Sequence, residues 1–162
     1  MKFLHAADLH LDRSFEGLTS VPEHFQERLI TANQKMLKNI VDTAITQAVD
    51  FVLLVGDTFH QNRPTLKTQR YFFQEMDRLA EAAIPVFMNF GNHDFYQADR
   101  YWFAFPENIQ LFDEERVETK KLVTNSGEKI AITSFSYLHP TIEALMIEQF
   151  PRKEDVDFHI GM

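Results

Sequence analysis

Three short apolar runs without polar alternation stand out along this chain, and polar residues follow each of them at once. In the middle run, Phe51–Val55, five apolar residues precede Gly56 and Asp57. An unbroken run of this length is typical of a parallel strand that is buried on both faces. The other two runs occupy residues 2–7 and 86–90. The pattern therefore predicts three buried strands.

Between these runs, apolar residues recur at near-helical spacing. One such segment extends from Pro22 to about Ala48, and proline suits the first position of a helix. The other extends to about Ala83, with Thr65 as its expected N-cap and Pro85 as the residue that ends it. Alternating strands and helices predict a doubled βαβ unit with a parallel sheet.

The second half of the chain has a different pattern, with shorter apolar segments and more turn residues. It predicts a strand at 109–112, a hairpin of 117–123 with 128–135, a helix at 141–150 and a last strand at 157–162. The chain stops inside this last strand. We therefore expect a single, truncated domain that spans residues 1–162.

Composition narrows the classes of protein. The 162 residues are 44% hydrophobic, which is enough for a core of one domain. No apolar run is long enough to cross a bilayer, and the N-terminus lacks the apolar core of a signal peptide, so we expect a cytoplasmic protein without membrane contact. There is no cysteine, so a metal would be held by oxygen and imidazole ligands. The net charge of −8 argues against a plain nucleic-acid-binding surface, although bound metal ions would reverse this locally.

Oxygen and nitrogen ligands stand at the carboxyl end of each predicted buried strand. Because the carboxyl ends of parallel strands meet at one edge of a sheet, these side chains are expected to lie together. Asp8-x-His10 alone is weak evidence for a pair of metal ligands, since a surface loop also explains it. The set of three strand ends is a strong signal for a metal site. The sequence predicts a metal site at this edge, formed by Asp8, His10, Asp57, Asn92 and His93.

The segments HAADLHLD, GDTFHQNRP and IPVFMNFGNHDFY carry these residues, and through them the chain resembles the calcineurin-like metallophosphoesterases. Within that superfamily it is most similar to SbcD-type nucleases of DNA double-strand-break repair. The resemblance covers about residues 1–97. It implies a layered α/β/β/α sandwich, of which this chain has the first βαβαβ half and the start of the second sheet.

The resemblance also implies roles for the site residues. Asp8 and His10 would hold a first metal ion, Asp57 would bridge two ions, and Asn92 would hold the second. His93 would stabilise the phosphate or protonate the leaving oxygen, Asp94 would orient His93, and His60 would position the phosphate. The implied cofactor is a pair of Mn ions, with Mg, Fe and Zn as alternatives.

The activity implied by the resemblance is metal-dependent exonuclease or endonuclease cleavage of DNA, with an SbcC-like ATPase as partner. A phosphatase or cyclic-nucleotide phosphodiesterase, and a non-catalytic fragment that keeps the fold, are the alternatives. The family's later histidine and G-H-x-H block are absent from this chain. We therefore expect it to bind one Mn ion at Asp8, His10 and Asp57, to be inactive by itself, and to self-associate through unpaired sheet edges.

Other candidates have plainer explanations. Three basic residues could contact a DNA backbone, although a solvated helix face explains them as well: Arg63, Lys67 and Arg70. Tyr96, Tyr101 and Trp102 could stack on bases, but core packing is favoured for them. His5 is expected to be a hydrogen-bonded core residue. His139 and His159 could take the place of a missing metal ligand, but neither has the flanking pattern of the family's later blocks.

Overall fold

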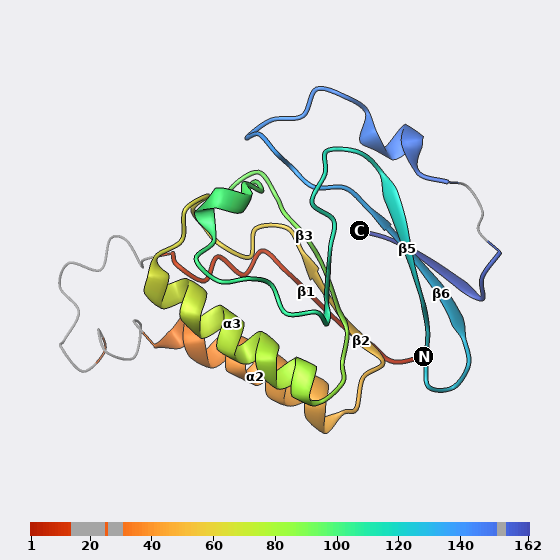
Figure 1. The fold of residues 1–162 in the computed structure, drawn as a ribbon, viewed down its shortest axis with the longest axis horizontal. Coiled ribbons are helices and arrows are strands. Elements are labelled where there is room, and N and C mark those ends of the chain that lie inside the picture. The colour runs from red at the N-terminus through yellow and green to blue at the C-terminus, as the bar shows by residue number, and fades with distance from the viewer. Residues whose placement is uncertain (14–24, 26–30, 152–154) are drawn as a thin grey trace.

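In a computed structural model, residues 1–13, 25, 31–151 and 155–162 are described, and they form a layer of helices and two sheets (Figure 1). The first sheet has four parallel strands in the order β1-β2-β3-β4. These are β1 (Phe3–Ala7), β2 (Phe51–Val55), β3 (Val86–Asn89) and β4 (Ile109–Leu111). The predicted parallel sheet is thus confirmed, and β2 and β3 are buried as expected. β1 is not, because it lies at the edge of the sheet and its exposed and partly buried residues alternate.

Two helices, α2 (Ala32–Thr46) and α3 (Leu66–Glu81), cover one face of this sheet. The Thr65 hydroxyl accepts a hydrogen bond from the Thr68 N–H (3.2 Å), which confirms the predicted N-cap of α3. The expected start of the first helix, at Pro22, lies outside the described residues. Within them, Thr31 is in a turn and α2 begins one residue later.

The second sheet consists of β5 (Glu118–Val123), β6 (Lys129–Ser134) and β7 (Phe158–Gly161). β5 and β6 form the predicted antiparallel hairpin, and β7 lies parallel to β6. Phe51, Phe87 and other side chains of the first sheet meet Ile130 and Ile132 of β6 in a second core. Alternating residues of β2 and β3 thus contribute to two cores, which explains why these strands lack polar alternation.

The helix expected at 141–150 and the core position expected for His5 are both wrong. Instead of a helix at 141–150, the chain forms a single 3₁₀ turn, η2 (Met146–Gln149). Of its apolar residues only Met146 is buried, whereas Leu145 and Ile147 are 69% and 73% exposed, so an α-helix here would have little apolar surface to pack against. His5 is exposed, because β1 is an edge strand and its odd-numbered residues point away from the helix layer. No helix among the described residues is long and apolar enough to cross a membrane.

Candidate metal centre

The loops that follow β1 and β2 run side by side beyond the sheet. The Asp8 N–H donates to the Gly56 carbonyl (3.3 Å), and the His10 N–H donates to the Asp57 carbonyl (2.9 Å). The Asn33 amide of α2 donates to the carbonyls of Leu11 and Arg13 (both 3.2 Å) and so supports the first loop from the helix layer. Backbone bonds between strand ends therefore set the positions of the side chains above them.

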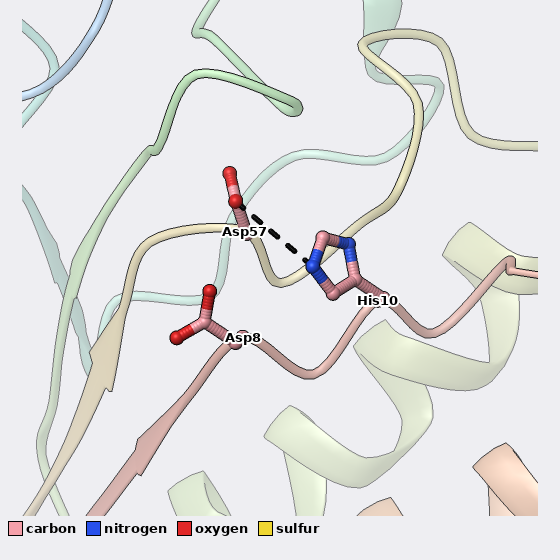
Figure 2. A group of neighbouring side chains, drawn as sticks. All are labelled: Asp8, His10 and Asp57. Atoms are coloured by element: carbon pink, nitrogen blue, oxygen red, sulfur yellow. Dashed lines mark ion pairs between the residues drawn. The ribbon is translucent and has the colours of Figure 1, made fainter.

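Asp8, His10 and Asp57 converge, as Figure 2 shows. One ligand atom from each lies within 4.8 Å of the other two. His10 Nε2 lies 4.0 Å from Asp57 Oδ2. Two carboxylates and an imidazole suit a divalent cation, and the chain has no thiolate that would favour a softer one. The donor set present therefore fits the expected metal.

All three converging residues have left-handed backbone conformations. The φ angles are 53° for Asp8, 45° for His10 and 46° for Asp57. The other non-glycine residues with positive φ in the described parts of the chain are Ala48 and Ala83, which immediately follow helices. Such conformations cost free energy for residues with a Cβ and tend to cluster at functional sites. The strained backbone coincides with the candidate ligands.

The 91–94 segment after β3 packs directly against Asp57. The His93 N–H donates to Asp57 Oδ1 (3.0 Å), and a Cβ built on Gly91 would lie 2.2 Å from the same oxygen. Glycine is needed here because the carboxylate occupies the space of a side chain. Asn92, exposed, directly precedes His93 in this segment. The predicted second-metal ligand thus lies in the loop that contacts the predicted bridging carboxylate.

Three imidazoles gather beside the carboxylates. The ring centroids of His10, His60 and His93 are 5.0 to 5.2 Å apart, and His60 and His93 are stacked. Nδ1 of His60 lies 3.3 Å from Nδ1 of His10. A hydrogen bond between these two nitrogens requires that one of them carries a proton and the other does not. If His10 Nδ1 carries it, His10 Nε2 is left with a free lone pair beside the carboxylates, as a metal ligand requires.

Asp94 has partners other than the expected one. Its carboxylate is buried and accepts backbone N–H groups of Asp57 (3.1 Å), Phe59 (3.2 Å) and Gly91 (2.8 Å). Burial raises the pKa of Asp94 to about 6, and its backbone hydrogen bonds lower the pKa in part. Within the described structure it makes no bond to the His93 ring. Asp94 therefore joins the loops after β2 and β3.

Two further polar residues support the site and were not predicted. Asp12 Oδ1 accepts the His60 N–H (2.5 Å), and its Oδ2 is buried and has no hydrogen-bond partner among the described residues. Asn89, at the end of β3, accepts the Gly56 N–H (2.8 Å) and donates to Ser134 of the second sheet (3.0 Å). Asn89 could have been noticed from the sequence, because it is the polar residue within the otherwise apolar run 86–90. Asp12 stood within the family-like segment HAADLHLD.

The remaining candidates lie outside this cluster. Arg63, Lys67 and Arg70 are exposed at the start of α3 and its preceding turn. Tyr96 and Tyr101 pack against the helix-side core, as favoured, but Trp102 is 68% exposed and the core assignment is wrong for it. Its neighbours fill the available space beside α3 and leave the indole outside. Among the alternative ligands, His139 is exposed, and His159 Nε2 lies 2.7 Å from the Thr133 hydroxyl in the second sheet.

Comparison with known proteins agrees with this geometry. The profile of the calcineurin-like phosphoesterase family matches residues 1–160. YhaO of Bacillus subtilis, described as an uncharacterized metallophosphoesterase, is 33% identical over all of this chain and 40% of its own length. The DNA double-strand break repair protein Mre11 of Archaeoglobus fulgidus is 30% identical over 70% of this chain and 24% of its own.

Two further relatives extend the comparison. The SbcD component of the SbcCD nuclease of Bacillus subtilis is 27% identical over 85% of this chain and 34% of its own length. A dimetal phosphatase of Danio rerio has the same fold, with a TM-score of 0.50 at 12% identity, over 90% of this chain and 48% of its own. The chain therefore spans 40% or less of the length of these curated relatives.

The chain belongs to the calcineurin-like phosphoesterase family. Its parallel sheet and mixed second sheet form the corresponding metallophosphoesterase fold. Members of this family are hydrolases that bind divalent metal ions, and Asp8, His10 and Asp57 could form such a metal site in this chain.

Proposed function

We propose that the chain carries the catalytic centre of a metal-dependent phosphodiesterase that cleaves DNA. The observation that supports this most is the position of two further imidazoles, those of His60 and His93, beside the Asp8, His10 and Asp57 donors. The names of two relatives, an Mre11 repair protein and a component of the SbcCD nuclease, point to the same substrate class. An SbcC-like ATPase partner is part of the proposal.

In this proposal Asp8, His10 and Asp57 would hold one ion, and Asp57 and Asn92 would hold the other. Bound divalent ions would polarise the phosphate and lower the pKa of an attacking water. Mn is the proposed metal, since carboxylate and imidazole ligands suit it, with Mg, Fe or Zn as alternatives.

The imidazoles of His93 and His60 act on the leaving group and on the phosphate. A diester releases an alkoxide oxygen, which leaves more easily when a neighbouring acid protonates it. If the His10 Nδ1–H donates a hydrogen bond to His60 Nδ1, the neutral tautomer of His60 has its N–H at Nε2. His93 is exposed and has its backbone fixed to Asp57, so its ring can face a bound phosphate. His93 is therefore the proposed proton donor, and His60 positions the phosphate.

Hydrolysis of two small substrates tests the proposal. The protein, expressed from its complete coding sequence, is assayed with Mn or EDTA on bis-p-nitrophenyl phosphate and p-nitrophenyl phosphate, and on linear duplex DNA. We expect Mn-dependent cleavage of DNA and a preference for the diester. With linear duplex DNA, whose leaving group is an alkoxide, His93→Gln should lower kcat by about 10²- to 10⁴-fold, whereas His139→Gln, an exposed control, should not. A preference for the monoester would favour a phosphatase, and unchanged turnover in His93→Gln would remove the proposed acid.

A further inference from the structure

A large aromatic side chain stands exposed at the start of α3. The Trp102 indole is 68% exposed. Phe103, the next residue, and Leu66, the first residue of α3, are 36% and 54% exposed. We call these three residues, with the basic side chains Arg63, Lys67 and Arg70, the Trp102 patch. The mechanism proposed above uses none of its aromatic or aliphatic residues.

The backbone that carries Trp102 is tied to α3 by one fully buried side chain. Gln69 Nε2 donates to the carbonyls of Pro64 (3.0 Å) and Arg100 (2.9 Å). Gln69 Oε1 accepts the Trp102 N–H (2.9 Å). Through Gln69 these bonds join the turn before α3 to the 100–102 segment, so Trp102 stands on a fixed backbone.

Residues on both sides of Trp102 pack inward. The Tyr101 ring lies 5.0 Å from that of Phe105, and the Phe103 ring lies 5.6 Å from Phe73 of α3. These contacts orient the neighbours toward the protein while the indole remains in solvent. An aromatic ring on a fixed backbone has only two side-chain torsions to restrict, so it loses little conformational entropy when it binds a flat ligand.

The patch borders the metal centre. The Arg100 guanidinium donates to the carbonyl of Asn62, two residues after His60 (3.4 Å). Figure 1 shows η1 (Ala98–Arg100), in green, beside the loop that leads from β2 into α3. The two segments that leave the metal centre after β2 and β3 therefore meet again at the patch.

The segment that Gln69 joins to the Trp102 backbone is positively charged, unlike the chain as a whole. From Thr58 to Gln74 there are three basic residues and no acidic one, in a chain of net charge −8. Arg63, Lys67 and Arg70 form no ion pair within the described part of the chain, and Asp99 is the acidic residue closest to Trp102 in the sequence. Positive charge beside an exposed aromatic ring is what single-stranded nucleic acids require, because phosphates contact the cations and bases stack on the ring.

We propose that Trp102 is a stacking platform for an unpaired base of the DNA substrate, and that Arg63, Lys67 and Arg70 hold the flanking phosphates. The inference rests on the proposed function, because it takes DNA as the substrate. It deepens that function by assigning a preference for single-stranded segments next to the metal centre. The apolar surface of a partner protein would be a weaker match, because it could cover the indole but would leave Arg63, Lys67 and Arg70 without negatively charged groups.

Fluorescence tests this directly, because Trp102 is the single tryptophan of the 162 residues. The chain is titrated in EDTA with an oligothymidylate of about 12 nucleotides and with a duplex of the same length. We expect the single strand to quench the emission and to bind more tightly than the duplex. Trp102→Ala should weaken binding of a dye-labelled single strand by about 5- to 150-fold. Trp102→Phe, which keeps an aromatic face, should retain most of the affinity.

Matched variants separate stacking from other effects. Ile147→Ala removes an equally exposed apolar side chain from η2 and should leave binding unchanged. Arg70→Gln should reduce the magnitude of the slope of log K against log salt concentration by about one. Circular dichroism checks that each variant is folded.

Several results would contradict the proposal that Trp102 is a stacking platform. These are absence of single-strand binding, binding without a change in Trp102 emission, unchanged affinity in Trp102→Ala, or equal affinity for the duplex. A blue shift on concentrating the protein without DNA would identify the patch as a contact between copies, against the proposal. Because binding is measured without metal, quenching without diester hydrolysis would reject only the proposed function. Hydrolysis without quenching would reject only the platform.

Discussion

Replacement of Gly91 by alanine should disable the metal centre while leaving the fold in place. The added Cβ would lie 2.2 Å from Asp57 Oδ1 and 2.8 Å from its Cγ, whereas ordinary van der Waals contact begins at 3.4 Å. The carboxylate or the 91–94 segment must therefore move by roughly 1 Å, since overpacking is relieved by such shifts at about 1–3 kcal/mol. The movement breaks the bond from the His93 N–H and displaces the carboxylate that faces His10.

We expect Gly91→Ala to lower Mn affinity by about 10- to 100-fold, the usual effect of disturbing groups that orient a ligand. Calorimetric titration with Mn measures the affinity, and urea denaturation measures the free energy of unfolding. Gly127→Ala is the matched control, because Gly127 has a φ of 86° and nothing within 4 Å of an added Cβ. It should lose about 1–2 kcal/mol of stability and no Mn affinity. Wild-type Mn binding in Gly91→Ala would show that this contact does not position Asp57.

Two other changes have definite expected results. Asp57→Ala should abolish Mn binding to residues 1–162 in calorimetry, whereas His93→Ala should leave it nearly intact because His93 is not a proposed ligand; two tight sites, or loss of binding in His93→Ala, would indicate another ligand. Ala83→Gly should raise the free energy of unfolding in urea by about 1 kcal/mol, since Ala83 has a φ of 54° just after α3 and glycine avoids its strain; an unchanged or lower value would contradict this.

The fold could be predicted where burial alone decides it. The unbroken apolar run of β2 identified a strand covered on both faces, and the structure has a core on each side of it. The carboxyl ends of parallel strands must share an edge, so the convergence of Asp8, His10 and Asp57 followed from the strand assignment. Local chemistry also sufficed for the Thr65 cap, since its hydroxyl needs only the N–H three residues later.

Features that depend on distant partners could not be predicted. The 141–150 segment has helix-forming residues, but in the structure most of its apolar side chains find no surface to cover. The aromatic cluster at 101–105 gave no indication of which ring would remain outside; that depends on Gln69, more than thirty residues away in sequence. The sequence likewise placed Asp94 beside His93 but could not show that its carboxylate binds three backbone amides of two loops.

The stability of the metal-free protein should depend on the protonation of Asp94. Its pKa is raised from 3.8 to about 6, chiefly by burial, so the folded state holds this proton more tightly than the unfolded state. Stability from Asp94 is therefore fully present below pH 3.8 and is lost as pH rises through about 6. A shift of this size corresponds to about 3 kcal/mol.

Other carboxylates titrate in the same range, so the comparison is with Asp94→Asn, which stays neutral throughout. The amide nitrogen introduced by this substitution cannot accept the Phe59 N–H, but that loss is independent of pH and leaves the slope interpretable. In EDTA, we expect the free energy of unfolding of the wild type to fall relative to the variant by up to about 3 kcal/mol between pH 4 and 7. A relative rise would mean that the three amide hydrogen bonds outweigh burial and that Asp94 is ionised throughout this range. In that case the carboxylate would join the two loops as an anion, and its negative charge would add to those of Asp8 and Asp57 in attracting a cation.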